Sequence, residues 1–258
     1  EGRLLNKRRE QNVERCFQQP SPRLGGPTPE LLVVTCDGGM VQTRDGDPPW
    51  KSDKIGCVYD AIPLPDTAAA SATHYRGARA KTKTYVATMR PWADLGRMLY
   101  AEAASRGILQ ARHVLFLSDG AEAIKDLRTG HFANASALID WFHADEHLHD
   151  CGKAIFASDP DKAEAWAEDL GDHLWSGRLD QVIATIHDHS RQLGPPPQGA
   201  SSSDPRLILH RNVHYFTVNQ HEMDYPAART QGWPIGSGVA ESAVKLFGLR
   251  LKGSEKFW

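Results

Sequence analysis

The sequence has no long apolar run and few cysteines. No stretch of its 258 residues approaches the roughly 20 consecutive apolar residues that a membrane-spanning helix needs, and the N-terminus lacks the basic-then-apolar pattern of a signal peptide. The four cysteines, Cys16, Cys36, Cys57 and Cys151, are scattered and form no C-x-x-C pair. These absences argue against a membrane protein, a disulfide framework and a thiolate zinc site, and they predict a cytoplasmic protein with reduced thiols.

An excess of charge of either sign is also missing. The chain has 30 Lys and Arg residues against 32 Asp and Glu residues, which gives a formal net charge of −2. Phosphate binding needs Lys and Arg clustered on one face, so this composition does not by itself indicate a nucleic-acid-binding protein. Because the first residue is Glu1 and the last, Trp258, directly follows a basic run, we expect a fragment of a longer protein.

The first half of the sequence predicts a helix, a meander of strands and a second helix. Residues 1–29 mix charges and then become rich in Pro and Gly, which predicts a short helix and a linker. An apolar, β-branched strand at 31–36 stops at Asp37-Gly38-Gly39, and residues 40–43 return as a possible second strand. Two further strands, at 54–64 and 83–89, suggest an antiparallel meander, with a flexible connection between them. An amphipathic helix follows from Pro91 to Gly107.

The second half predicts two more strands and a long helical block. Residues 113–118 read as a buried strand that ends at Asp119-Gly120, and residues 137–143 as another short strand. Helical periodicity then extends over 147–156, 161–193 and 205–220. A Gly- and Pro-containing turn at 232–238 leads into a helix that contains Glu241.

Three acidic residues acquire a chemical meaning when they are taken together. An Asp-Gly pair after an apolar run is most often a turn, and a Glu early in a helix can simply complement the helix dipole. However, two strands of one sheet that end in Asp37 and Asp119 can place both carboxylates at the same edge, and a helix packed on that sheet can add Glu241. Such a cluster suits Mg²⁺, which prefers oxygen ligands, and two such ions promote in-line displacement at phosphodiesters.

Four stretches carry a resemblance to a known family. They are TCDGGMVQTR (35–44), FLSDGAEAI (116–124), ALIDWFHADEHL (137–148) and PIGSGVAESAVKLFGLRLKGS (234–254). In order and content they resemble the successive blocks of DDE transposases of bacterial insertion sequences, especially the ISKra-type branch. The resemblance covers residues 30–258. The last block is the most specific, because Gly-Ser-Gly-x-x-Glu followed by Arg-Leu-Lys-Gly is not an arrangement that turn chemistry requires.

The resemblance implies an α/β protein with an RNase H-like fold. In that fold a mixed five-stranded sheet is flanked by helices, with the first Asp on the first strand, the second on the fourth strand and the Glu on a later helix. After the N-terminal helix and linker that the composition predicts at 1–29, it implies the first part of the core at 30–146, an all-helical insertion at 147–230 and the catalytic C-terminal helix at 231–258. Such an insertion usually helps to hold DNA or a partner subunit.

The resemblance also implies the activity and its residues. Asp37, Asp119 and Glu241 would be the catalytic residues and the ligands of two Mg²⁺ ions, with Mn²⁺ as a substitute. The reaction would be DNA cleavage and strand transfer at insertion-sequence ends. The expected partners are the DNA of the transposon ends, target DNA and further copies of the chain on that DNA, in the bacterial cytoplasm at the nucleoid.

Several nearby residues have an accessory interpretation and a structural one. His143 matches a histidine that often lies near the metal site in related transposases, and it is equally well explained as a packed or capping residue at a strand end. If the stretch is helical instead, His143 and His147 could share one helix face and bind zinc with Asp140 or Asp145.

The cations after Glu241 have the same two interpretations. Arg250 and Lys252 would either contact DNA phosphates or form a solvated basic face.

Two rival functions remain open on the sequence. One is a metal-dependent hydrolase of small phosphate or amide substrates, built on Asp37, Asp119 and the two histidines, in which Glu241 would be dispensable. The other is a DNA-binding transposase remnant without catalytic activity.

Overall fold

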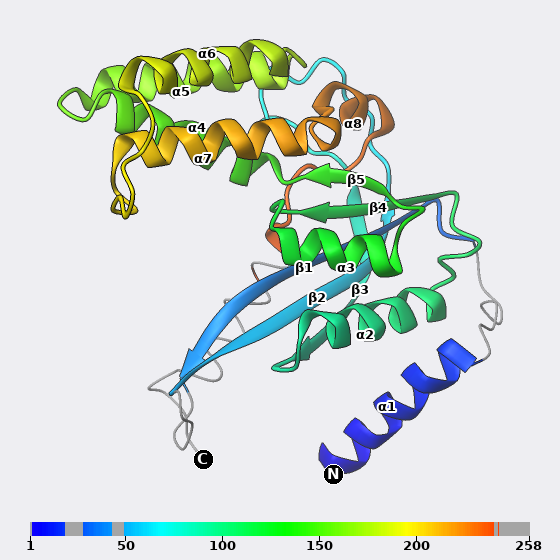
Figure 1. Cartoon of the computed structure of the whole chain (residues 1–258). Coiled ribbons are helices and arrows are strands. Elements are labelled where there is room, and N and C mark those ends of the chain that lie inside the picture. Colours follow the sequence, from blue (N-terminus) through cyan, green and yellow to red (C-terminus); the bar gives the residue numbers. More distant parts are fainter. Residues whose placement is uncertain (1, 19–27, 43–48, 240–241, 243–258) are drawn as a thin grey trace, which may run out of the picture. The chain divides into compact units, whose positions relative to one another are not determined.

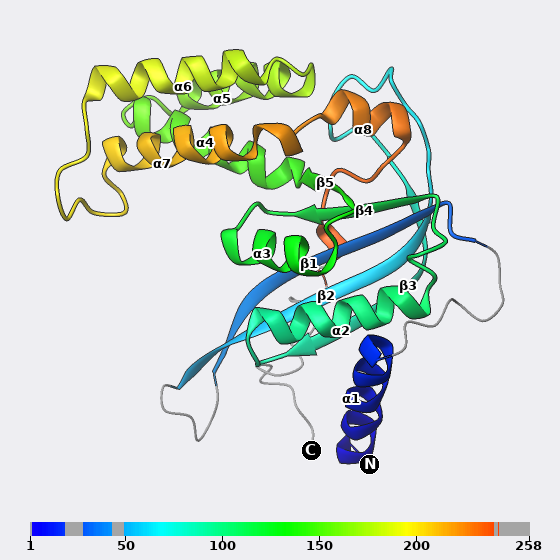
Figure 2. The same cartoon turned by 45° about the vertical axis from the view of Figure 1, so that its right-hand side comes forward.

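The computed structural model of the chain describes residues 2–18, 28–42, 49–239 and 242. In chain order its helices and strands are α1 (Gly2–Gln18), β1 (Leu31–Gln42), β2 (Trp50–Ile62), β3 (Arg79–Thr88), α2 (Trp92–Ser105), β4 (His113–Ser118), α3 (Glu122–His131), β5 (Ser136–Ile139), α4 (Trp141–Ile155), α5 (Pro160–Trp175), α6 (Leu179–Leu193), α7 (Pro205–Asn219), the 3₁₀ turn η1 (Gln220–Glu222) and α8 (Tyr225–Gln231). Figure 1 shows these elements, and Figure 2 shows them from a second direction.

The chain forms two compact units, each built from separate stretches of sequence. The first comprises Glu1–Pro63, Ala78–Ala137 and Ser237–Trp258, and it contains α1, α2, α3 and the sheet up to the middle of β5. The second comprises Leu64–Gly77 and Leu138–Gly236 and is mainly helical. The protein is therefore an α/β protein in which a five-stranded mixed sheet is flanked by helices.

The sheet has the strand order β3-β2-β1-β4-β5. β1, β2 and β3 form the predicted antiparallel meander, whereas β1 and β4 pair in parallel from Leu31 opposite His113 to Thr35 opposite Leu117. A parallel pair needs a long crossover, and here β2, β3 and α2 supply it. The crossover places the two Asp-bearing strands side by side in the middle of the sheet.

One face of the sheet forms the core of the first unit together with α2 and α3. The members of this cluster are Leu32, Val34, Cys36, Val58, Val86, Leu95, Leu99, Ala103, Phe116, Ile124, Leu127 and Phe132. Alternation along β1 sends its even-numbered side chains into this cluster, so Leu31, Val33 and Thr35 belong to the opposite face. These three residues are fully buried as well, and Asp37 continues their row.

β1 is longer than the sequence predicts. Asp37-Gly38-Gly39 is not a turn, because Asp37 lies opposite Ile55, Gly38 opposite Lys54 and Gly39 opposite Asp53 in one uninterrupted antiparallel ladder with β2. The predicted strands at 31–36 and 40–43 are thus one strand of 12 residues. Asp37 therefore lies inside a strand.

The helical unit begins earlier than expected. β5 ends at Ile139, and α4 starts at Trp141, so residues 141–143 are helical rather than the end of a strand. α4 also runs through position 147, where the sequence places the start of the helical insertion. Helices then continue to Gln231 with interruptions, in agreement with the predicted helical block.

Short acidic caps define the helix starts of the second unit. Asp159, Asp204 and Asp224 accept backbone N–H groups at the beginnings of α5, α7 and α8, and a proline follows in the first turn of each of these helices. A cluster of buried aromatic rings, Trp141, Trp175 and Tyr225, packs edge to face between the helices. The caps and this cluster fix where the helices begin and how they pack.

The connection at 64–77 is held by the second unit rather than being a free loop. The Tyr75 hydroxyl donates to the carbonyl of Trp233 at 2.9 Å, and the Trp175 indole N–H donates to the carbonyl of Ala69 at 3.1 Å. Gly77 has a φ of +57°, which a glycine adopts without strain. Among the residues that the structure describes, no helix has both the length and the apolarity to cross a membrane.

Candidate functional site

Asp37 lies in the middle of β1. It comes two residues after Thr35, which is the last residue of β1 that pairs with β4. Its Oδ1 atom accepts the N–H of Gly38 at 2.6 Å, which orients the carboxylate. Gly38 lies in close contact with α2, because a Cβ atom there would come within 3.2 Å of the Trp92 ring. The glycine after Asp37 thus has a packing role and does not make a turn.

Asp119 directly follows β4, as predicted. Its Oδ1 atom accepts the N–H of Ala121 at 2.8 Å, so the carboxylate begins the turn into α3. Gly120 has a φ of +88°, a conformation that favours glycine. The Asp-Gly pair here is a genuine turn, and it holds the carboxylate at the end of the strand.

The parallel register brings the two carboxylates together. β1 and β4 pair in parallel up to Thr35 opposite Leu117, so Asp37 and Asp119 each come two residues after this last pair. Neighbouring strands lie about 4.8 Å apart. The pairing therefore brings the two aspartates to the same end of the β1–β4 ladder.

The electrostatics of Cys36 support this juxtaposition. Burial raises the pKa of the Cys36 thiol far above its usual value, and the negative charges of Asp119 and Asp37 raise it further. Both carboxylates thus lie within electrostatic range of one sulfur atom. The same sulfur remains a neutral thiol at physiological pH and belongs to the core on the other face of the sheet.

Asp53 is a further acidic residue near Asp37, and it is not among the residues predicted from the sequence. It lies in β2 opposite Gly39, so it shares the face of Asp37 and is its diagonal neighbour. The residue is 6% exposed, and its Oδ1 atom has no hydrogen-bond partner among the residues that the structure describes. A buried carboxylate oxygen without a partner is unusual in proteins and is a common feature of sites that bind an ion or a water molecule.

The sequence signal for Asp53 is weak. It lies in the polar stretch Lys51-Ser52-Asp53-Lys54, which suggests a solvated strand end. Only the pairing of β2 with β1 shows that this aspartate lies beside Asp37.

The remaining predicted site residues of the last block lie outside the described residues. They are Glu241, Arg250 and Lys252. Gly238 and Val239, just before Glu241, have helical backbone conformations, and Ser237 is buried.

His143 lies in α4 of the second unit. Its backbone N–H points to the Asp140 carboxylate, which caps the helix, and its Nδ1 atom lies 3.6 Å from the Glu146 carboxylate. The capping residue of α4 is therefore Asp140, and His143 lies in the first turn of this helix rather than at a strand end.

The helical geometry required for the zinc alternative is present, but the ligands have other contacts. The His147 ring stacks on Tyr215 with centroids 3.9 Å apart, and burial lowers the pKa of His147. Asp145 lies 3.7 Å from His149 rather than joining the two predicted histidines. Within the described part of the chain, no group of three or more His, Cys, Asp or Glu side chains is arranged to hold a metal ion.

The carboxylate pair fits Mg²⁺ by the chemistry of its donors. Mg²⁺ is commonly bound through one or two carboxylates plus substrate phosphates and water rather than through a complete protein cage. Asp37 and Asp119 supply two such carboxylates, and the unpartnered oxygen of Asp53 can accept a hydrogen bond from a water molecule nearby. The pair would leave the other coordination positions to water and substrate.

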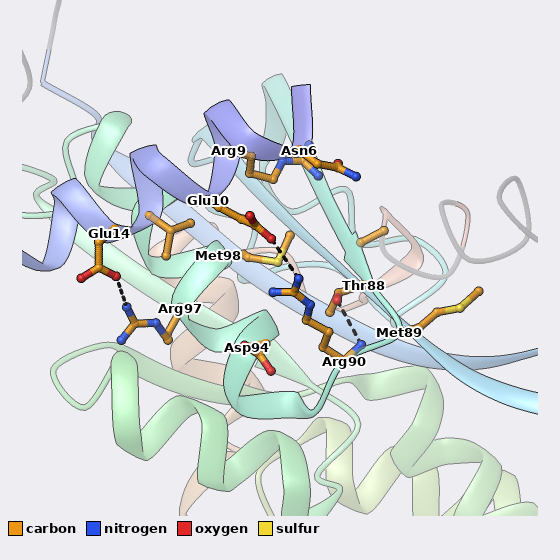
Figure 3. A pocket seen from close by; sticks show the side chains of 12 residues that line it. Asn6, Arg9, Glu10, Glu14, Thr88, Met89, Arg90, Asp94, Arg97 and Met98 are labelled. Carbon is orange, nitrogen blue, oxygen red and sulfur yellow. Dashed lines mark hydrogen bonds and ion pairs between the residues drawn. The ribbon is translucent and has the colours of Figure 1, made fainter. Parts of the chain in front are cut away.

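A separate pocket lies between α1, α2 and the end of β3, and it contains none of the predicted site residues (Figure 3). Its volume is about 490 Å³. Two exposed ion pairs cross it, Arg90 with Glu10 at 2.9 Å and Arg97 with Glu14 at 3.2 Å. Arg90 and Arg97 of this pocket are therefore balanced by carboxylates of α1.

Comparison with known proteins adds no relative: no protein-family model matches the chain, and a search of curated proteins found no match.

Proposed function

We propose that this chain is the catalytic core of a DDE-type transposase, which cleaves and joins DNA at the ends of an insertion sequence with Mg²⁺ as its cofactor. The observation that supports the proposal is the parallel pairing of β1 and β4, which ends two residues before both Asp37 and Asp119 and so brings the two aspartates to the same end of adjacent strands. Two carboxylates in this arrangement suit the hard cations that phosphodiester chemistry requires.

The fold supports the same proposal. An RNase H-like fold has a mixed five-stranded sheet with the first Asp on the first strand and the second on the fourth, and here Asp37 lies in β1 and Asp119 directly follows β4. Helices α4 to α8 occupy the place of the expected insertion, and the segment after it begins the motif with Glu241. We therefore infer an RNase H-like fold with a helical insertion.

Each site residue would have its own role in the reaction. Asp37 and Asp119, oriented by their backbone hydrogen bonds, would hold the metal ions beside the scissile phosphate, and Glu241 would complete the ligand set. Bound Mg²⁺ would supply Lewis acidity toward the phosphate oxygens and the attacking hydroxyl. Water would first free a 3′-hydroxyl at the element end, and that hydroxyl would then attack target DNA. Such an enzyme would act in the bacterial cytoplasm as several copies on DNA.

The decisive experiment is cleavage and strand transfer on a labelled duplex that carries the element end, with Mg²⁺ or Mn²⁺. Nicking of supercoiled plasmid serves as a readout that needs no terminal sequence. We expect Asp37→Asn and Asp119→Asn each to lower the rate at least about 100-fold with DNA binding retained, since even partners of metal ligands typically contribute 10- to 100-fold. Glu241→Gln is expected to do the same.

The matched control is Asp188→Asn, which removes an exposed carboxylate of α6 and should leave the rate unchanged. Full activity of Glu241→Gln together with loss of activity in His143→Ala would instead support a hydrolase of small substrates. A wild-type chain that binds DNA and never cuts it would contradict the enzymatic proposal and indicate a remnant.

A further inference from the structure

The nearly neutral sequence contains one long basic segment. Between Asp66 and Asp94 there is no acidic residue, and the cations in this interval are Arg76, Arg79, Lys81, Lys83 and Arg90. The formal charge of −2 for the whole chain conceals this segregation. A local excess of this kind attracts polyanions, whatever the net charge of the molecule.

Three of these cations lie on one edge of the sheet. Arg79, Lys81 and Lys83 belong to β3, which among the described strands is the outermost one on the side of β2. All three residues are exposed. The hydroxyl of Thr82, which is also exposed, is a further donor for phosphate oxygens.

The basic edge belongs to the same sheet as the carboxylate pair. Asp37 lies opposite Ile55, and Ile55 lies opposite Ala87, so the level of Asp37 meets β3 at Ala87. Lys83 is four residues from that level, which corresponds to about 13 Å along the strand. It also projects to the face of Asp37, since Lys83 pairs with Tyr59. β3 is separated from β1 by β2, which adds about 10 Å across the sheet. A duplex that lies along this edge, about 20 Å wide, would therefore extend toward Asp37.

The edge strand is held rigidly at its basic segment. The ladder between β2 and β3 shifts between Tyr59 and Ala61, because β3 has one extra residue there. Such bulges re-aim side chains at a sheet edge. The Arg106 guanidinium of α2 fixes this point by donating to the Thr82 carbonyl at 3.1 Å and to the Thr84 hydroxyl. The cations are thus displayed from a fixed backbone.

These cations also differ from their neighbours in having no described acidic partner. Arg90 and Arg97 form ion pairs with α1, and Arg106 forms ion pairs with Asp60 and Glu102. No described carboxylate forms an ion pair with Arg79, Lys81 or Lys83. A charged edge can also serve only to keep sheets of separate chains from pairing. That role does not depend on the sheet that carries the cations also carrying Asp37, and the binding test below separates the two roles.

We propose that the edge of β3 formed by Arg79, Lys81 and Lys83 binds the phosphate backbone of duplex DNA and guides it past Asp37 and Asp119. The inference rests on the proposed function for the role of this DNA as the substrate. The three cations of β3 lie outside the motif that contains Arg250 and Lys252, so they would form an additional surface that binds the DNA backbone.

The test measures binding of a fluorescein-labelled 30-bp duplex of arbitrary sequence by anisotropy, in EDTA, over a range of NaCl concentrations. The variant Arg79→Gln/Lys81→Gln/Lys83→Gln should reduce the slope of log K against log[NaCl] by about 3, since each lost phosphate contact reduces it by about 0.9. Affinity near 0.1 M salt should fall roughly 10- to 100-fold. The conservative variant Arg79→Lys/Lys81→Arg/Lys83→Arg should retain the wild-type slope.

The matched control is Lys153→Gln/Arg191→Gln/Arg211→Gln, which removes the same charge from exposed positions on α4, α6 and α7. An equal loss of affinity in this control would overturn the inference, and so would an unchanged slope in the β3 variant or tighter binding of single-stranded DNA than of the duplex. Circular dichroism and gel filtration verify that each variant is folded and not aggregated.

The two proposals can fail separately. If the wild type cleaves DNA and the β3 variant binds DNA as the wild type does, the proposed binding surface is contradicted and the transposase proposal stands. If the β3 variant loses DNA binding and the wild type never cuts DNA, the binding surface is supported and the proposed enzymatic activity is contradicted.

Discussion

Single residues of β1 show how closely the site and the core are joined. Asp37 and Cys36 are neighbours in sequence, yet alternation along the strand sends one to the carboxylate face and the other into the core. The thiol therefore experiences both carboxylates without being part of the site. Burial in the core is the main cause of the raised pKa of this thiol, and the two carboxylates raise it further.

Alkylation of the cysteines measures this consequence. Burial raises the pKa of Cys57 to about 12 and the pKa values of Cys36 and Cys151 further, while Cys16 in α1 is only partly buried. Because the thiolate is the reacting species, we expect iodoacetamide at pH 8 to label Cys16 at least about 100-fold faster than the other three.

Raising the pH from 7 to 9 should accelerate labelling of Cys16 and leave Cys36 almost unmodified, as judged by peptide mass spectrometry. The unfolded chain in guanidinium is the control, in which all four cysteines should react alike. Rapid labelling of native Cys36 would show instead that the pairing of β1 with its neighbours opens readily.

Among the elements, those with strong local patterns could be predicted from the sequence. The strands around 31–36, 54–64, 83–89 and 113–118 and the helix after Pro91 all form near the expected positions. The extension of β1 could not be predicted, because Asp37-Gly38-Gly39 has the composition of a turn and only the pairing with β2 keeps it extended.

Some residues of the candidate site could likewise be predicted from the sequence, and others could not. Asp37 and Asp119 stand out because each follows an apolar strand, so the pair could be predicted before its geometry was known. Asp53 could not, since its place depends on the register between two strands. His143 was ambiguous because the boundary between β5 and α4 is set by the Asp140 cap, a contact that periodicity does not reveal.

Gly→Ala substitutions at two helical positions can separate the effect of packing on stability from that of intrinsic helix propensity. Propensity alone predicts that Gly→Ala stabilises either helix by about 0.5–1 kcal/mol. In α3, a Cβ atom at Gly130 would meet nothing within 4 Å, so Gly130→Ala should be stabilising by this amount. In α4, a Cβ atom at Gly152 would lie 2.5 Å from the backbone carbonyl oxygen of Ala163 in α5.

Gly152→Ala should therefore be destabilising by about 1–3 kcal/mol, because backbone cannot move aside as a flexible side chain can. Urea unfolding monitored by circular dichroism and by hydrogen exchange in α4 and α5 gives both values. Equal stabilisation by the two substitutions would mean that α4 and α5 do not approach as closely as described.

On the scale of the whole molecule, charge is segregated although the total is nearly zero. The first unit combines carboxylates at one end of the β1–β4 ladder with a cationic strand edge. Under the proposed function, the carboxylates of Asp37 and Asp119 repel each other when no metal ion is bound, and this repulsion lowers the stability of the folded state. A divalent cation that binds both carboxylates should remove this repulsion and so raise the stability of the folded state.

Thermal unfolding with and without Mg²⁺ tests this link between the carboxylate pair and global stability. For a dissociation constant on the order of 1 mM, 10 mM Mg²⁺ stabilises the folded chain by about 1.4 kcal/mol, or about 3–5 °C in Tm. Asp37→Asn should show a higher Tm than wild type in EDTA, since one of two repelling charges is gone, and no specific response to Mg²⁺. Asp188→Asn should respond as wild type does, and NaCl at matched ionic strength corrects for screening. A Mg²⁺ response of equal size in Asp37→Asn would place the cation elsewhere in the molecule and separate the carboxylate pair from metal binding.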